Sequence, residues 1–202
     1  MVIEKSKLIK IITLIFLILF FYSNFLSKAD DIKDFEIEGM GIGDSLLNFF
    51  NEKQIIDNNP GYKYHSDEFY ATVFYDEKFY KTYESLEIHL KKNDKKYMIY
   101  AIDGLIFYDD INKCYSKQKE ITKEIGSIFK NIDMVDVGTR KLSGDKSGKS
   151  TSKTFYWEFG FGNFIAVECY DWSKEILKKN GWHDNLRISI ISKELNDWLK
   201  MN

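Results

Sequence analysis

The sequence predicts an α+β domain, with a single mainly antiparallel sheet covered by one long amphipathic helix and with short N- and C-terminal helices. Apolar and polar side chains alternate over residues 84–91 and again over 186–190, as they do in half-buried strands. Apolar residues recur at three- and four-residue spacing over 111–129, which is typical of an amphipathic helix. Short turns join most of the strand-like segments, so neighbouring strands are expected to run antiparallel.

The first 29 residues have the pattern of a targeting segment. Lysines precede an apolar run over residues 11–22, and the small residues Ser27 and Ala29 stand where a signal peptidase reads. The run is short for a membrane span, which needs about 20 residues. Two interpretations stay open, a cleaved signal peptide and a retained N-terminal membrane anchor. In both, residues 30–202 form a single exported α+β domain, either periplasmic or anchored to the inner membrane.

The remaining elements are predicted in chain order from their composition. Asp44 is expected to cap a helix that buries Leu46, Leu47 and Phe50, and Asn51 with Gln54 resembles the capping arrangement of a second short helix. Further along the chain we expect strands at 69–75, 84–91, 96–108, 134–137, 154–159, 164–170 and 186–190. Gly104 is expected to mark a bulge in the strand at 96–108. We also expect a helix capped by Asp110, a short helix at 172–179 and a terminal helix capped by Ser192.

Charge and motif spacing exclude several classes of partner. After residue 29 the chain carries 25 basic and 30 acidic residues without a basic block, so a nucleic-acid partner is not expected. Residues 147–151 look like the end of a phosphate-binding loop, but the required upstream glycine is displaced and a strand-like segment follows, so no nucleotide cofactor is expected. No metal site is predicted, and His89 is expected to face outward from its strand. The partners that remain are an envelope protein, a glycan or a small apolar ligand.

A four-residue string offers a catalytic alternative. Gly43-Asp44-Ser45-Leu46 resembles the signature of the GDSL lipases and esterases, in which the serine is the nucleophile. That resemblance implies a secreted serine hydrolase using Ser45, with Asp44 and His183 as the other candidate residues. However, none of the three histidines has an aspartate three residues before it, as the family's base motif requires. A serine without a base keeps its proton, so the preferred interpretation is a helix start.

Residues 62–83 are dense in aromatic side chains. The candidates for a binding face are Tyr70, Phe74, Tyr75 and Tyr80. Rings displayed on a strand can stack on sugars or hold apolar ligands. The alternative is that these rings fill the core and the flanks of the sheet.

The chain has two cysteines, which allow one pairing. Cys114 belongs to the apolar stripe of the long helix, and Cys169 shares a strand face with Ile165 and Val167. Both are therefore expected to point inward. Free buried cysteine behaves as a small hydrophobe, whereas an oxidising compartment favours a disulfide. Both outcomes stay open, and export favours the bond.

Residues 37–47 read I-E-G-M-G-I-G-D-S-L-L, which resembles the opening of a group of short, exported bacterial proteins. The similarity extends through Cys114, the loop at 145–149 and residues 169–173. No activity is assigned to that group, so the resemblance implies export and a single domain. We therefore expect an exported cell-envelope protein that acts as a non-catalytic binding or structural module.

Overall fold

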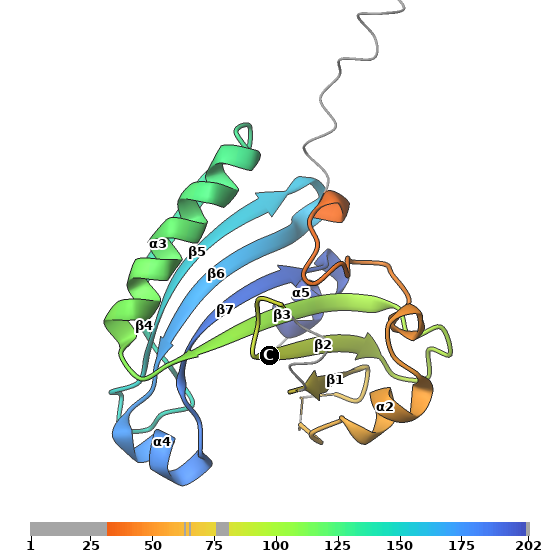
Figure 1. The fold of residues 1–202 in the computed structure, drawn as a ribbon, viewed down its shortest axis with the longest axis horizontal. Helices are drawn as coiled ribbons and strands as arrows, with labels where there is room; N and C mark the ends of the chain where they lie inside the picture. The colour runs from red at the N-terminus through yellow and green to blue at the C-terminus, as the bar shows by residue number, and fades with distance from the viewer. Residues whose placement is uncertain (1–31, 63, 65, 76–80, 201–202) are drawn as a thin grey trace, which may run out of the picture.

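The computed structural model describes residues 32–62, 64, 66–75 and 81–200 of the 202-residue chain. The predicted targeting segment, residues 1–29, lies outside the described residues. The centre of the molecule is a single seven-stranded sheet in the order β1-β2-β3-β7-β6-β5-β4 (Figure 1). Every neighbouring pair is antiparallel, so the predicted α+β class and single antiparallel sheet are confirmed.

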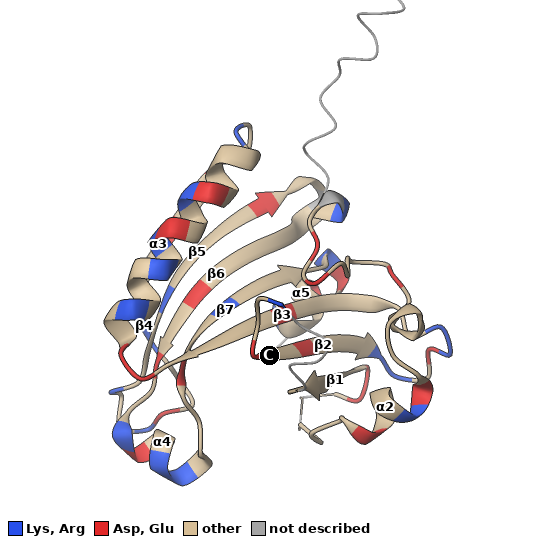
Figure 2. Ribbon diagram, in the orientation of Figure 1, with Lys and Arg blue, Asp and Glu red and all other residues tan. Residues whose placement is uncertain are grey.

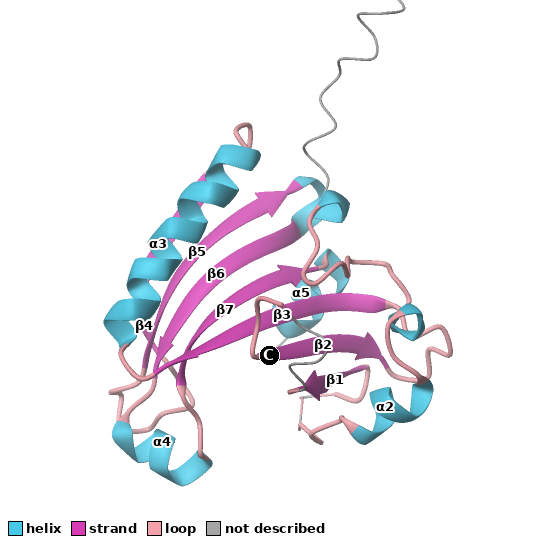
Figure 3. Ribbon diagram, viewed as in Figure 1, coloured by secondary structure: helices cyan, strands magenta, loops and turns pink. Residues whose placement is uncertain are grey.

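The elements follow the predicted order (Figure 3). The strands are β1 (Phe69–Phe74), β2 (Ser85–Lys91), β3 (Ile99–Tyr108), β4 (Met134–Lys141), β5 (Thr151–Phe159), β6 (Asn163–Asp171) and β7 (Asp184–Ile191). The α-helices are α2 (Glu52–Asp57), α3 (Ile111–Ile128), α4 (Lys174–Asn180) and α5 (Lys193–Lys200), with 3-10 turns η2 (Ile32–Asp34), η3 (Leu46–Asn48) and η4 (Gly160–Gly162). No helix in the described part of the chain is long and apolar enough to span a membrane.

Side-chain caps stand at three of the helix starts that the sequence predicts. Asn51 and Gln54 form a reciprocal capping box at the start of α2. The Asp110 carboxylate accepts a hydrogen bond from the backbone N–H of Asn112 at 3.0 Å. The Ser192 hydroxyl accepts one from the backbone N–H of Leu195 at 3.3 Å. These caps satisfy amide groups that the first turn of a helix leaves without partners.

One face of the sheet is apolar, and we call it the helix face. It carries the alternate side chains of the central strands, including Leu86, Ile88 and Ile188. Helix α3 packs against β6, β7 and β3 on this face. The N-terminal segment, from η2 to α2, covers the part of the same face near β1 (Figure 1). There the ring of Phe50 stacks on that of Phe74, with centroids 4.0 Å apart. The long helix therefore shares this face with the N-terminal segment.

Helix α3 is fastened to the sheet by one covalent and two polar contacts. Cys114 and Cys169 are joined as a disulfide, with Cα atoms 6.0 Å apart. One turn further on, the Gln118 amide donates to the backbone oxygens of Lys153 and Val167 at 2.7 and 2.9 Å. Gln118 is buried, and these bonds satisfy an amide that would otherwise be costly inside an apolar stripe.

Gly104 is not the bulge that the sequence predicts. It pairs in regular register with Leu86 on one side and Ile188 on the other, and the irregularity of β3 lies opposite His89 and Leu90 instead. The ring of Tyr83 occupies the place of a side chain, because a Cβ on Gly104 would lie 2.5 Å from that ring. A close approach between ring and backbone, rather than a bulge, explains this glycine.

We expect the disulfide to contribute substantially to stability. Replacing both Cys114 and Cys169 with alanine should lower the free energy of unfolding by about 4 kcal/mol, because a cross-link across 55 positions restricts the unfolded chain. Chemical denaturation of the wild type and the variant, each with and without reductant, measures the effect. Reductant should destabilise the wild type and leave the variant unchanged. Alkylation of both cysteines in the denatured, unreduced protein would show that the bond is absent.

Candidate functional site

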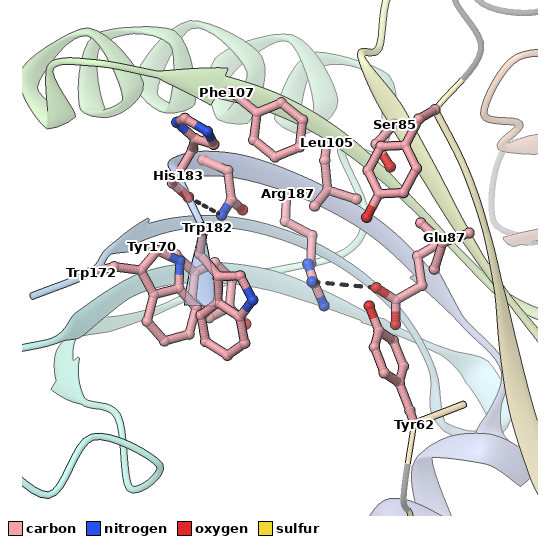
Figure 4. A pocket seen from close by; sticks show the side chains of 14 residues that line it. Tyr62, Ser85, Glu87, Leu105, Phe107, Tyr170, Trp172, Trp182, His183 and Arg187 are labelled. Atoms are coloured by element: carbon pink, nitrogen blue, oxygen red, sulfur yellow. Dashed lines mark hydrogen bonds and ion pairs between the residues drawn. The ribbon is translucent and has the colours of Figure 1, made fainter. Parts of the chain in front are cut away.

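The opposite face of the sheet, which we call the pocket face, contains a cavity of about 530 Å³. This volume is in the range of small-molecule sites. Strands β2, β3, β6 and β7 contribute to its walls, together with the end of β1 and the residues flanking α4 (Figure 4). Six aromatic side chains line it: Tyr62, Tyr75, Phe107, Tyr170, Trp172 and Trp182. Helix α5 packs on the same face through Leu195 and Trp198, against Phe69 and Ala101.

A cluster of four charged side chains lies beside this cavity. The register places Glu87 of β2 directly opposite Asp103 of β3, and both are buried. Like charges directly opposite one another destabilise a sheet. His89 supplies one compensating cation, with its Nε2 atom 3.4 Å from Glu87 and 3.6 Å from Asp103. Arg187 of β7 supplies the other, 3.7 Å from Glu87 and 3.4 Å from Asp103. Figure 2 shows a single acidic segment on β3, at Asp103, and a single basic segment on β7, at Arg187.

The cluster changes the protonation of its members. Burial by itself would lower the pKa of His89, but hydrogen bonding and charge from Asp103 and Glu87 outweigh burial and raise that pKa to about 9. Burial likewise would raise the pKa of Asp103, but the charges of Arg187 and His89 hold it below its usual range. His89, Asp103 and Arg187 are therefore charged at neutral pH.

The alternation over 84–91 predicts that His89 faces outward to solvent, and the structure shows that this prediction is wrong. His89 is buried, and its ring lies 6.2 Å from the ring of Tyr64, which in turn packs against Trp198 of α5. Period-two alternation identifies the two faces of a strand correctly, but both faces of β2 are covered. A polar residue at an alternate position is then buried with its partners.

The same cluster is the only group of potential metal ligands found among the described residues, with one ligand atom from each of Glu87, His89 and Asp103 within 4.8 Å of the others. A metal requires a neutral imidazole, so it would have to displace the proton that the raised pKa favours on His89. The Arg187 guanidinium also lies 3.4 Å from the Asp103 carboxylate that a metal would use. These residues fit an ion-pair cluster and do not fit a metal site.

A row of stacked side chains connects the cluster to the mouth of the cavity. The Arg187 guanidinium lies over the ring of Tyr170, 5.4 Å from its centroid. Tyr170 stacks on Trp172 at 5.6 Å and 14°, and Trp172 meets Trp182 edge-on at 4.5 Å. Figure 4 shows these rings on one side of the cavity and Tyr62 on the other. Each ring is held by its neighbour, so the wall is already ordered without a ligand.

The predicted aromatic face is divided between the two sides of β1. Tyr75 lines the cavity and is 66% exposed. Phe74 is buried against Phe50 on the helix face, and Tyr70 is half-buried on the same side. Because side chains alternate along a strand, these candidates could not share one surface. Tyr80 lies outside the described residues.

The structure corrects the prediction for Asp44. Its carboxylate accepts a hydrogen bond from the backbone N–H of Gly41 at 2.9 Å, so it closes the glycine turn instead of capping a helix. The helical segment that follows is only the 3-10 turn η3, and Ser45 precedes it without making a side-chain cap. The Ser45 hydroxyl donates instead to the backbone oxygen of Lys96 at 2.6 Å.

The structure does not bring Ser45 and His183 together. Ser45 pairs with Met98, just before β3 begins, whereas His183 packs against Phe107 near its end, with ring centroids 5.9 Å apart. A ten-residue strand separates them by about 30 Å along its length. His89 is engaged in the charged cluster, and His65 lies outside the described residues. The described histidines thus provide no base for Ser45.

Two residues singled out from the sequence, Tyr75 and His183, line the cavity, but the sequence did not indicate its charged residues. Glu87 and Arg187 occupy polar positions of two predicted strands, where a solvated face is the simplest interpretation. Asp103 and Arg187 are 84 positions apart, and their contact depends on β3 pairing with β7. A charge inside a long, mostly apolar strand segment such as 99–108 is the one signal that could have indicated a buried partner.

Comparison of the chain with protein-family models, curated proteins and solved structures gave no match.

We expect stability to depend on pH through His89. Its folded pKa of about 9 exceeds its ordinary value of 6.5, so its contribution is complete below pH 6.5 and is lost as pH rises through 9. The loss should be about 3 kcal/mol. Denaturation of the wild type and His89→Gln between pH 6 and pH 10 measures it, and an NMR titration of His89 gives the pKa directly. Parallel stability profiles for the two proteins would contradict this assignment.

Proposed function

We propose that this chain is an exported, non-catalytic binding module of the cell envelope that holds a small ligand in the cavity of its pocket face. The observation that carries the proposal is the combination of an ordered aromatic wall with a paired charge, Arg187 with Glu87, inside one cavity. Binding sites commonly combine apolar walls with a few placed polar groups that orient the ligand.

The rest of the molecule supports a binding role. Helix α3 and the N-terminal segment act as the rigid cover of the helix face, and this leaves the pocket face to carry the site. Ser45, the residue on which a secreted serine hydrolase would depend, uses its hydroxyl in a backbone hydrogen bond remote from the cavity. The Cys114–Cys169 pair supports export, because disulfides persist in oxidising compartments.

Binding can be tested before the ligand is known. We expect small ring-bearing fragments, detected by saturation-transfer NMR, to bind the wild type and to shift the indole N–H resonance of Trp182. Leu105→Trp should abolish binding, because Leu105 lines the cavity and a larger ring there fills it. Leu47→Trp is the matched control, since Leu47 is exposed and lies outside the cavity lining.

The outcome of this experiment is decisive in both directions. Amide spectra of both variants check that they are folded, and the Trp182 shift in the wild type gives an answer even if Leu105→Trp does not fold. If fragments fail to bind the wild type, or bind the folded Leu105→Trp variant equally well, the cavity is not a binding site.

Export is a separate part of the proposal. The basic and apolar pattern of residues 1–29 predicts that alkaline phosphatase fused after residue 60 is active, since this enzyme requires export. An inactive fusion would contradict export. N-terminal sequencing of the exported protein distinguishes cleavage before Asp30 from a retained anchor.

A further inference from the structure

The exposed rings at the mouth of the cavity indicate what kind of ligand it takes. Trp182 is 47% exposed although it is fixed by its contact with Trp172, and Tyr62 and Tyr75 are also exposed. Exposed rings that are held in place bind a flat partner with little loss of conformational freedom. The negative face of an aromatic ring attracts the weakly positive hydrogens of an apolar molecular face.

Polar groups lie between these rings. Glu87 and Arg187 both line the cavity, as does Asn185. The Nε atom of Arg187 and the Oδ1 atom of Asn185 are buried and have no hydrogen-bond partner in the described part of the chain. A wholly apolar ligand would enclose Glu87 and Arg187 without giving them new partners, which is unfavourable.

The charges of the cavity disfavour an ionic ligand. Glu87 and Arg187 are already paired at 3.7 Å, so a ligand with one full charge would have to compete with this pair. Glu168, a further carboxyl group, lies opposite Arg187 in the β6–β7 register, outside the cavity lining, and accepts hydrogen bonds from Thr154 and Tyr170. The chemistry that remains is an uncharged ring with an apolar face and hydroxyl groups around its edge.

We propose that the cavity binds a neutral carbohydrate, with one sugar ring stacked on Trp182 and its hydroxyl groups bonded to Glu87 and Arg187. This inference rests on the proposed binding function and specifies its ligand class. The carboxylate of Glu87 accepts from neighbouring hydroxyls, and the fork of Arg187 donates to them. The ring contacts from Trp182 through Trp172 to Tyr170 connect the sugar-binding ring to the guanidinium.

The test titrates cellobiose, maltose and N,N′-diacetylchitobiose into the full exported domain and follows binding by calorimetry and ligand-detected NMR. At least one disaccharide should bind the wild type. Trp182→Ala should weaken binding about tenfold, whereas Trp182→Phe, which keeps a ring, should stay within about threefold. Phe49→Ala removes an exposed ring outside the cavity lining and should leave binding unchanged. Tyr75→Ala, at an exposed position of the cavity, provides a second variant if Trp182→Ala does not fold.

Each outcome distinguishes this inference from the function on which it rests. If no disaccharide binds but ring fragments still occupy the cavity, the carbohydrate assignment is wrong and the binding module stands. If neither binds, both are wrong. Unchanged sugar affinity in Trp182→Ala would overturn the stacking geometry. Binding of diacetylchitobiose alone would identify an N-acetylated glycan, and binding of cellobiose or maltose would identify a neutral sugar without acetamido groups.

Discussion

Two buried carboxylates that face each other across neighbouring strands impose the strongest constraint on this structure. Glu87 and Asp103 are paired by the register of β2 and β3, and neither is tolerable in a covered position without a cation. His89 and Arg187 provide those cations from within the sheet. A slip of one residue in any of these strands would move a charge onto the apolar helix face. The cluster therefore favours one register of β2, β3 and β7 over the alternatives, whatever its net contribution to the free energy of folding.

Two segments cover the helix face, and they are attached to the sheet in different ways. Near β6 the contact is specific, since α3 is joined to the strand by the Cys114–Cys169 bond and by the amide of Gln118. Near β1 the cover is the N-terminal segment, whose main chain pairs with the start of β3 between Gly43 and Ile99. Together the two covers bury the apolar face of the sheet. They leave the other face free to combine charge with exposed rings.

The pocket face shows how a structural cluster can also serve a site. Arg187 neutralises buried carboxylates on one side and lies over Tyr170 on the other. Tyr170 stacks on Trp172, which in turn meets the exposed Trp182 edge-on. The polar centre and the aromatic mouth of the cavity are consequently parts of one ordered arrangement. No comparable arrangement surrounds Ser45, whose hydroxyl is occupied by the backbone of Lys96.

The sequence by itself determined the features that depend on local order or on a single periodicity. The alternation over 84–91 and 186–190 identified β2 and β7, the stripe over 111–129 identified α3, and Asp110 marked its start. The inward direction of Cys114 and Cys169 also followed from these periods and led to the disulfide.

Only the tertiary structure decided what the polar positions of the strands do. The sequence of an alternating strand is the same whether its polar face meets water or a second layer of the protein. The period of two gives the direction in which each side chain points, but not what it contacts. The contact between Asp103 and Arg187, 84 positions apart, exists only because β3 and β7 lie side by side.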